Sequence, residues 1–150
     1  MTASDNLARL RQWVDSINHG TPAFAETFAP DATIEVVGGP PDTRDRESFA
    51  NSMTALLAAF PGLQFTVDEQ LSAGEAGDVV VTRFTARGTH RGDQLGFPAT
   101  GKSVTIQGTI VDRLRDGVIV DRHEIVDALG LFQQLGVGPG QLPGMSPQVE

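Results

Sequence analysis

Cysteine and tyrosine are absent from the 150 residues of this chain, and lysine occurs once, at Lys102. Without cysteine the chain can form no disulfide framework, no thiolate metal site and no cysteine nucleophile. Long apolar runs are also missing, and the N-terminus lacks a basic segment followed by an apolar one, so the sequence predicts neither a membrane span nor a secretion signal. We therefore expect a cytoplasmic protein that does not bind membranes.

Positive charge is scarce as well. The formal net charge is −8 at pH 7, with 11 lysines and arginines against 19 aspartates and glutamates, and the arginines are scattered. Affinity for nucleic acid depends largely on basic side chains that neutralise phosphates. Nucleic acid is therefore not an expected partner.

Signatures of several other chemistries are missing. The candidate metal ligands His90, Asp112, His123 and Glu124 follow no familiar ligand spacing, and the adjacent His123 and Glu124 point to opposite faces of a strand. The glycine-rich stretch 38–41 lacks the lysine and the helix start of a phosphate-binding loop, and no Gly-x-Ser-x-Gly nucleophile elbow occurs. We expect no metal site.

The pattern of apolar residues predicts helices and strands in the order of an α+β protein. Ser4 is the expected cap of a first helix that ends at Asn18, and Thr21-Pro22 is expected to start a short second one. A third helix is predicted over Arg46–Phe60. Strands are predicted over 32–37, 63–71 and 78–90, then on both sides of Asp116-Gly117, with a last helix over 128–135 that Gly136 ends.

This order predicts a single domain over residues 1–136, followed by a loose C-terminal tail over 137–150. Helices gathered on one face of a curved, mostly antiparallel sheet form a cone, and such a cone encloses an internal hydrophobic cavity.

Asp116-Gly117 lies between two runs of alternating apolar and polar residues, which is a strong hairpin signal. A three-residue bulged turn would place Asp112 and Ile110 near Arg122 and Glu124, whereas a two-residue turn would shift the pairing by one. In the bulged register one face is mostly apolar with three charges in it, as small-molecule pockets are. Its residues are Ile106, Gly108, Ile110, Asp112, Leu114, Val118, Val120, Arg122, Glu124 and Val126.

Two further positions are candidates for the lining of this pocket. His90 has the same strand parity as Phe84 and Ala86, so we expect it at the mouth of the cavity. The loop over 91–101 carries Phe97, which is unusually apolar for an exposed connection, and such loops often flank binding sites.

Several short segments resemble the SnoaL-like polyketide cyclase family. They are 60–63 (FPGL), 88–92 (GTHRG), 96–101 (GFPATG), 116–120 (DGVIV), Gly130 and 134–136 (QLG). Together these motifs are specific for the family, although not for any one member. The family has the nuclear transport factor 2 type of α+β cone, shared with ketosteroid isomerase and scytalone dehydratase.

The resemblance implies an acid–base enzyme with no metal or organic cofactor, acting on a hydrophobic polycyclic or polyketide-derived substrate. Cyclases of the family close a ring by intramolecular aldol chemistry with an aspartate near the end of the last strand, where this chain has Glu124. The histidine that faces this carboxylate in the family is matched by Ile110. The expected substrate-binding residues are His90, Arg122, Ile110, Phe84, Phe97 and Val126.

The residues themselves leave alternatives open. Asp112 is either a second catalytic carboxylate or the ion-pair partner of Arg122, and Glu124 is either catalytic or a solvent-facing strand residue. Some relatives are auxiliary hydroxylases or epoxide-opening enzymes, and the same cone could serve as a non-catalytic binding module. We also expect a homodimer or higher oligomer through the outer sheet face, formed by Val79, Val81, Thr105, Thr109 and Val111.

Overall fold

The computed structural model describes residues 2–137 and confirms the expected α+β architecture. Most of the tail predicted over 137–150 therefore lies outside the described residues. The helices are α1 (Ala3–Asn18), α2 (Phe24–Thr27), α3 (Arg46–Ala59) and α4 (Ala128–Leu135), and the strands are β1 (Phe28–Val37), β2 (Gln64–Ala73), β3 (Val79–Thr89), β4 (Ser103–Arg115) and β5 (Val118–Val126).

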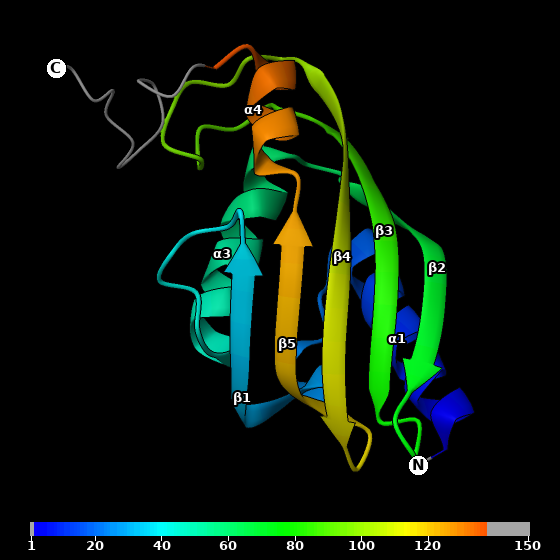
Figure 1. Ribbon diagram of the computed structural model, residues 1–150. Coiled ribbons are helices and arrows are strands. Elements are labelled where there is room, and N and C mark those ends of the chain that lie inside the picture. Colours follow the sequence, from blue (N-terminus) through cyan, green and yellow to red (C-terminus); the bar gives the residue numbers. More distant parts are fainter. Residues whose placement is uncertain (1, 138–150) are drawn as a thin grey trace, which may run out of the picture.

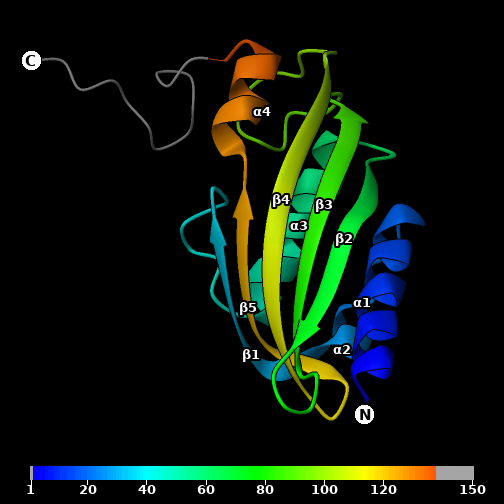
Figure 2. The ribbon, with the colours of Figure 1, turned by 45° about the vertical axis from the view of Figure 1, so that its right-hand side comes forward.

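The five strands form one sheet in the order β1-β5-β4-β3-β2. Neighbouring strands are antiparallel except β1 and β5, which are parallel. Helices α1 and α3 lie behind the same face of this sheet, and α4 follows the upper end of β5 (Figure 1, Figure 2). The sheet therefore has an inner face toward these helices and an outer face that they leave uncovered.

The start of the chain differs from the prediction. Thr2, not Ser4, caps α1: its hydroxyl accepts from the Asp5 backbone at 3.1 Å, and the Asp5 carboxylate accepts from the Thr2 backbone at 2.9 Å. This reciprocal pair requires a polar side chain three residues after the cap, and Ser4 has Leu7 there. Helix α2 begins at Phe24, later than expected, and it ends at Thr27, because the segment from Phe28 already pairs as edge strand β1.

The core between the helices and the inner sheet face has two parts. The first, here called the aromatic cluster, consists of Trp13, Phe24, Phe28 and Phe49, whose neighbouring ring centroids lie 5.1 to 6.2 Å apart. The second, here called the distal cluster, lies toward the 91–101 loop and α4. Its buried members are Ala59, Phe60, Leu63, Phe84, Ala86, Val104, Ile110, Leu131 and Leu135, with Phe97, Val126 and Phe132 packed against them.

The β4–β5 hairpin has a two-residue turn, so the expected three-residue bulged turn is wrong. Asp116 and Gly117 have φ of 52° and 78°, and Arg115 pairs directly with Val118. The pairing then shifts by one residue, because Leu114 pairs with Ile119 but Arg113 pairs with Asp121. This bulge restores the predicted pairing at the site, but it makes Ile119 the fully buried residue, while Val118 and Val120 are only partly buried.

Candidate functional site

Glu124 lies on the inner sheet face in a row of residues that crosses the sheet. It pairs with Ile110 on β4 and with Val36 on β1, and Ile110 in turn pairs with Thr82 on β3. Glu124 is 9 % exposed. The alternative of a solvent-facing strand residue is therefore wrong, because the register directs its side chain into the interior.

Asp112 and Arg122 form an ion pair in the next row. Arg122 donates from Nε to Oδ1 of Asp112 at 2.7 Å and from Nη2 to Oδ2 at 2.9 Å, and neither side chain is more than 1 % exposed. Arg122 Nη1 lies 3.6 Å from Oε1 of Glu124. Of the two roles considered for Asp112, the ion pair with Arg122 is present.

The aromatic cluster surrounds the guanidinium of this ion pair. The Cζ atom of Arg122 lies 4.9 Å from the ring centroid of Phe28, 5.6 Å from that of Phe49 and 5.8 Å from that of Trp13. Such distances allow cation–π attraction, which is strongest where water is excluded. Sequence reasoning placed Arg122 on the inner face but did not predict this aromatic surround, because it depends on how three separate elements pack.

Burial is the largest influence on both interior carboxyl groups. It raises the pKa of Glu124, while Arg122 opposes the rise and Asp112 adds to it. Burial also raises the pKa of Asp112, against the charge and hydrogen bonds of Arg122. For Arg122 burial acts in the lowering direction, but Asp112 and Glu124 outweigh it, so its pKa is raised and the guanidinium stays charged.

The apolar wall beside Glu124 includes three of the predicted binding residues. Ile110 is its direct partner, and Phe84 and Val126 face each other across Gly108 in the adjacent row. A Cβ at Gly108 would collide with the Phe84 ring, so the glycine leaves room for this ring against β4. Thr82, 2 % exposed, was missed, although its parity between Val80 and Phe84 could have indicated it.

His90 and Phe97 are in contact with each other but lie far along the sheet from Glu124. Their ring centroids are 5.2 Å apart, and Phe60 flanks His90 at 5.3 Å. His90 lies eight residues beyond Thr82, about 26 Å of extended strand. The two residues therefore belong to the far end of the distal cluster, and not to the immediate surroundings of Glu124.

The ring of His90 is fully buried, which confirms its interior parity but not a place at an open mouth. The Thr100 backbone N–H donates to Nδ1 at 3.0 Å, so the neutral ring carries its proton on Nε2. Among the described residues Nε2 has no hydrogen-bond partner. His90 thus attaches the far end of the 91–101 loop to the end of β3.

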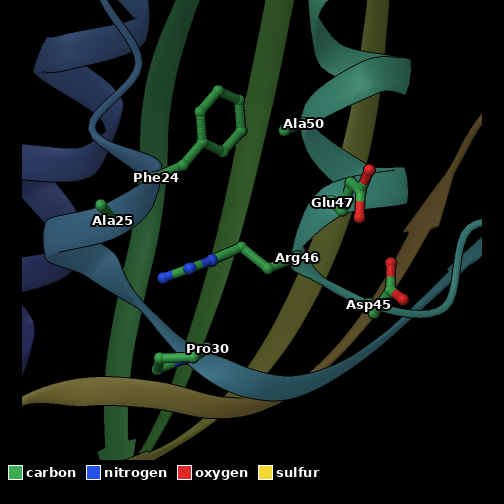
Figure 3. Close-up of a pocket in the computed structure, with 7 residues that line it drawn as sticks. All are labelled: Phe24, Ala25, Pro30, Asp45, Arg46, Glu47 and Ala50. Atoms are coloured by element: carbon green, nitrogen blue, oxygen red, sulfur yellow. The ribbon is translucent and has the colours of Figure 1, made fainter.

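Two hollows in the surface lie away from Glu124. One, of about 340 Å³, lies between α2 and the start of α3, where Arg46 extends toward Ala25 and Pro30 and donates to the Phe28 carbonyl at 3.2 Å (Figure 3). Asp45 and Glu47 point away from this guanidinium. The other, of about 310 Å³, adjoins Phe84, Gly108 and Val126. Glu124 lines neither hollow.

The remaining candidates lie outside this arrangement. His123 is half exposed on the outer face, as its strand parity predicted. Its Nδ1 atom lies 3.2 Å from Oε1 of Glu35. Within residues 2–137 no three histidine, aspartate or glutamate side chains are grouped as metal ligands would be. None of the helices in the described part of the chain is long and apolar enough to cross a membrane.

Fold and site together define a small α+β cone protein in which the buried carboxyl group of Glu124 lies against an apolar wall. The family model for SnoaL-like polyketide cyclases matches residues 8–135. The chain belongs to the SnoaL-like polyketide cyclase family.

Relatives of known name agree with this membership. Aklanonic acid methyl ester cyclase DnrD of Streptomyces peucetius is 33% identical over 96 residues, which are 64% of this chain and 65% of that cyclase. The match thus spans slightly less than two thirds of the relative. IdmH of Streptomyces antibioticus, provisionally assigned as a polyketide cyclase, is 35% identical with a TM-score of 0.71, covering 91% of this chain and 100% of IdmH.

A third protein is similar in fold only. AclR of Streptomyces galilaeus, provisionally assigned as a hydroxylase, has a TM-score of 0.80 at 23% identity, covering 92% of this chain and 89% of AclR.

Proposed function

We propose that this protein is a cofactor-independent acid–base enzyme of natural-product biosynthesis, a cyclase that closes or rearranges a ring on a hydrophobic polycyclic substrate. Glu124 is the proton-transfer residue. The observation that carries the proposal is a buried carboxyl group with a raised pKa beside the apolar Ile110. The resemblance to the family matches this position to its acid–base aspartate. A group that titrates nearer neutrality than an exposed glutamate is well suited to proton transfer.

The reaction follows from one group that can take up and return a proton. Glu124 removes a proton from a carbon activated by neighbouring carbonyl groups, and the resulting enolate carbon attacks a second carbonyl carbon of the same molecule. A carbon–carbon bond forms, and the attacked oxygen takes up the proton that Glu124 returns. Substrate and product are then isomers, so the reaction consumes no oxidant or reductant.

The substrate is proposed to occupy the distal cluster. Phe84, Ile110 and Val126 contact the part that reacts, and His90 and Phe97 contact the far end of an extended molecule, because all five belong to this continuous apolar cluster or pack against it. The two hollows described above lie elsewhere and are not the proposed substrate site.

The second candidate is epoxide opening or auxiliary hydroxylation. The observation that favours it is Ile110, which gives Glu124 an apolar neighbour where the family's cyclases carry a histidine. A single protonated carboxyl group is enough to donate a proton to an epoxide oxygen. A non-catalytic binding module is the remaining possibility for this cone.

Aklanonic acid methyl ester, the compound that the relative's name specifies, is the first substrate to test. Chromatography with mass detection separates the reactions, because ring closure leaves the mass unchanged, hydration adds one water and hydroxylation adds one oxygen atom. We expect a product of unchanged mass, and we expect activity to survive EDTA. Binding without turnover of this ester and of related epoxides would identify a binding module.

The decisive variant is Glu124→Gln, which keeps the shape of the side chain but cannot exchange the proton. We expect turnover to fall by about 10²–10⁴-fold, with little change in substrate affinity. Asp112→Asn should cost less, because Asp112 contacts Arg122 and not the substrate. Undiminished turnover in Glu124→Gln together with an inactive Asp112→Asn would reverse the two roles.

The assembly is proposed to be a homodimer or higher oligomer through the outer sheet face. Helices α1 and α3 cover only the inner face (Figure 2), so β-branched residues such as Val81 and Val111 stay partly exposed on the outer one. A second copy of the chain would bury them.

A further inference from the structure

Two interior carboxylates share one arginine, but the contacts are unequal. Asp112 receives two hydrogen bonds, at 2.7 and 2.9 Å, which are lengths typical of charge-assisted bonds. Glu124 has only a 3.6 Å approach from Nη1, beyond hydrogen-bond distance. Arg122 therefore gives most of its charge compensation to Asp112.

The surroundings hold Arg122 in this orientation. The Nε–Nη2 edge of the planar guanidinium is used by Asp112, and the rings of Phe28, Phe49 and Trp13 lie within 5.8 Å of its Cζ atom. The side chain is 1 % exposed, so it has almost no contact with bulk water. As long as Asp112 is present, Arg122 cannot offer the same edge to Glu124.

We propose that Asp112 is a positioning residue: it holds Arg122 by two oxygens, restricts Arg122 to one long contact with Glu124, and so leaves Glu124 as the interior carboxylate that exchanges protons with the substrate. This inference rests on the proposed function of Glu124. It assigns different roles to the two acidic residues that the sequence could not separate.

The charges around Glu124 are few enough for the effect to be measured. Strand β4 contributes Asp112 and β5 contributes Arg122, and these are the two charged groups that act on the pKa of Glu124 within the described part of the chain. The partner on β1 is the apolar Val36, and α3 contributes the apolar Phe49 to this part of the core. Asp121, on the outer face, acts on Asp112.

Opposite shifts are expected from two variants. In Asp112→Asn a negative neighbour is removed and Arg122 can turn its paired edge to Glu124, so Glu124 should titrate at lower pH, by about one unit or more. In the double variant Asp112→Leu with Arg122→Met, the opposing guanidinium is absent and Glu124 should titrate at higher pH than in the wild type. The negative charge of Asp112 itself raises the pKa of Glu124, so part of the downward shift in Asp112→Asn comes from its loss, and the double variant, which also removes the guanidinium, measures the contribution of Arg122.

The experiment is a carbon-13 NMR titration of the protein labelled in its glutamate carboxyl groups, without any substrate. The Glu124 signal is the one that disappears in Glu124→Gln, and Arg113→Gln, which changes an exposed arginine next to Asp112 in the chain, is the matched control. A midpoint in Asp112→Asn that stays at or above the wild-type value would overturn the proposal. If Asp112→Asn does not fold, the double variant decides: a Glu124 titration midpoint no higher than that of the wild type would overturn the proposal.

This titration and the turnover assay can fail separately. Shifts as expected, with Glu124→Gln fully active, would leave the positioning by Asp112 correct and the proposed catalytic role wrong.

Discussion

The carboxyl group of Glu124 lies where water cannot fully solvate its charge, and this has a consequence for stability as well as for chemistry. Burial raises the pKa of Glu124 in the folded protein. In the unfolded chain a glutamate titrates near its ordinary value of about 4.3. The folded state therefore holds the proton more tightly than the unfolded state does.

The first prediction concerns the free energy of unfolding as a function of pH. Below the unfolded pKa the contribution of Glu124 is fully present, and it is lost as pH rises through the raised, folded value. We expect Glu124→Gln to gain stability relative to the wild type as pH increases from about 4.3, as measured by urea denaturation over a pH series. Glu35→Gln, at a carboxylate 64% exposed, serves as the control and should show no such gain. A constant difference between wild type and Glu124→Gln at every pH would contradict the prediction.

At the residue scale the sequence predicted which side chains face inward but not how far apart they lie. Strand parity correctly placed Glu124, Asp112 and Arg122 on one face, because side chains alternate strictly along a strand. Parity carries no information on position along the strand. His90 was therefore grouped with Glu124. On β3, however, the residue in the same row as Glu124 is Thr82, and His90 lies eight residues beyond it.

At the scale of elements, the 91–101 loop is held at its far end by the fully buried ring of His90. The Thr100 backbone N–H donates to Nδ1 at 3.0 Å, and the Gly101 N–H donates to the His90 carbonyl at 2.8 Å. Phe97 packs on the same ring. The His90 side chain thus connects the loop to the end of β3 in two ways, by the hydrogen bond from Thr100 and by its contact with Phe97.

The second prediction follows from the acceptor at Nδ1. Replacing His90 with phenylalanine keeps an aromatic ring but leaves the buried Thr100 N–H without its acceptor, so we expect faster hydrogen exchange at Thr100, by about tenfold or more. In His90→Asn the side-chain oxygen can take the place of Nδ1, and we expect most of the protection to return. Exchange at a β4–β5 amide such as Ile110 should be unchanged. Equal protection in His90→Phe and in the wild type would show that this hydrogen bond does not hold the loop.

The sequence predicted most elements well and the hairpin only in part. Alternation and helical spacing gave β3, α3 and α4 to within one or two residues. The Asp116-Gly117 signal gave the hairpin, but its turn has two residues and the extra residue lies at Val120. Both arrangements give the same pairing of Asp112 with Arg122, so the correct site was obtained from an incorrect turn. A bulge has no sequence signal as strong as that of a turn.

At the scale of the whole molecule, none of the helices within residues 2–137 covers the outer face of the sheet (Figure 1, Figure 2). The helices cover the inner face only (Figure 1). Two ion pairs lie on the outer face, Arg83 with Glu69 at 3.0 Å and Arg113 with Asp121 at 3.6 Å. Between these pairs lie Val81 and Val111, which are neighbours across β3 and β4.

The last prediction is that this face joins two or more copies of the chain. Burying apolar surface stabilises association by roughly 25 cal/mol for each Å² removed from water, and charges that are already paired lose less on burial than single ones do. Val111→Lys would place an unpaired charge in the centre of the contact, so we expect sedimentation to show a dimer or larger species for the wild type and a monomer for this variant. Leu129→Lys is the matched control, because Leu129 is 70% exposed on α4 and lies outside the sheet.

Each chain carries a formal charge of −8, so added salt should screen the repulsion between copies and strengthen the assembly. A wild-type monomer at micromolar concentration would contradict the prediction, and loss of the assembly in Leu129→Lys but not in Val111→Lys would move the interface from the sheet to α4.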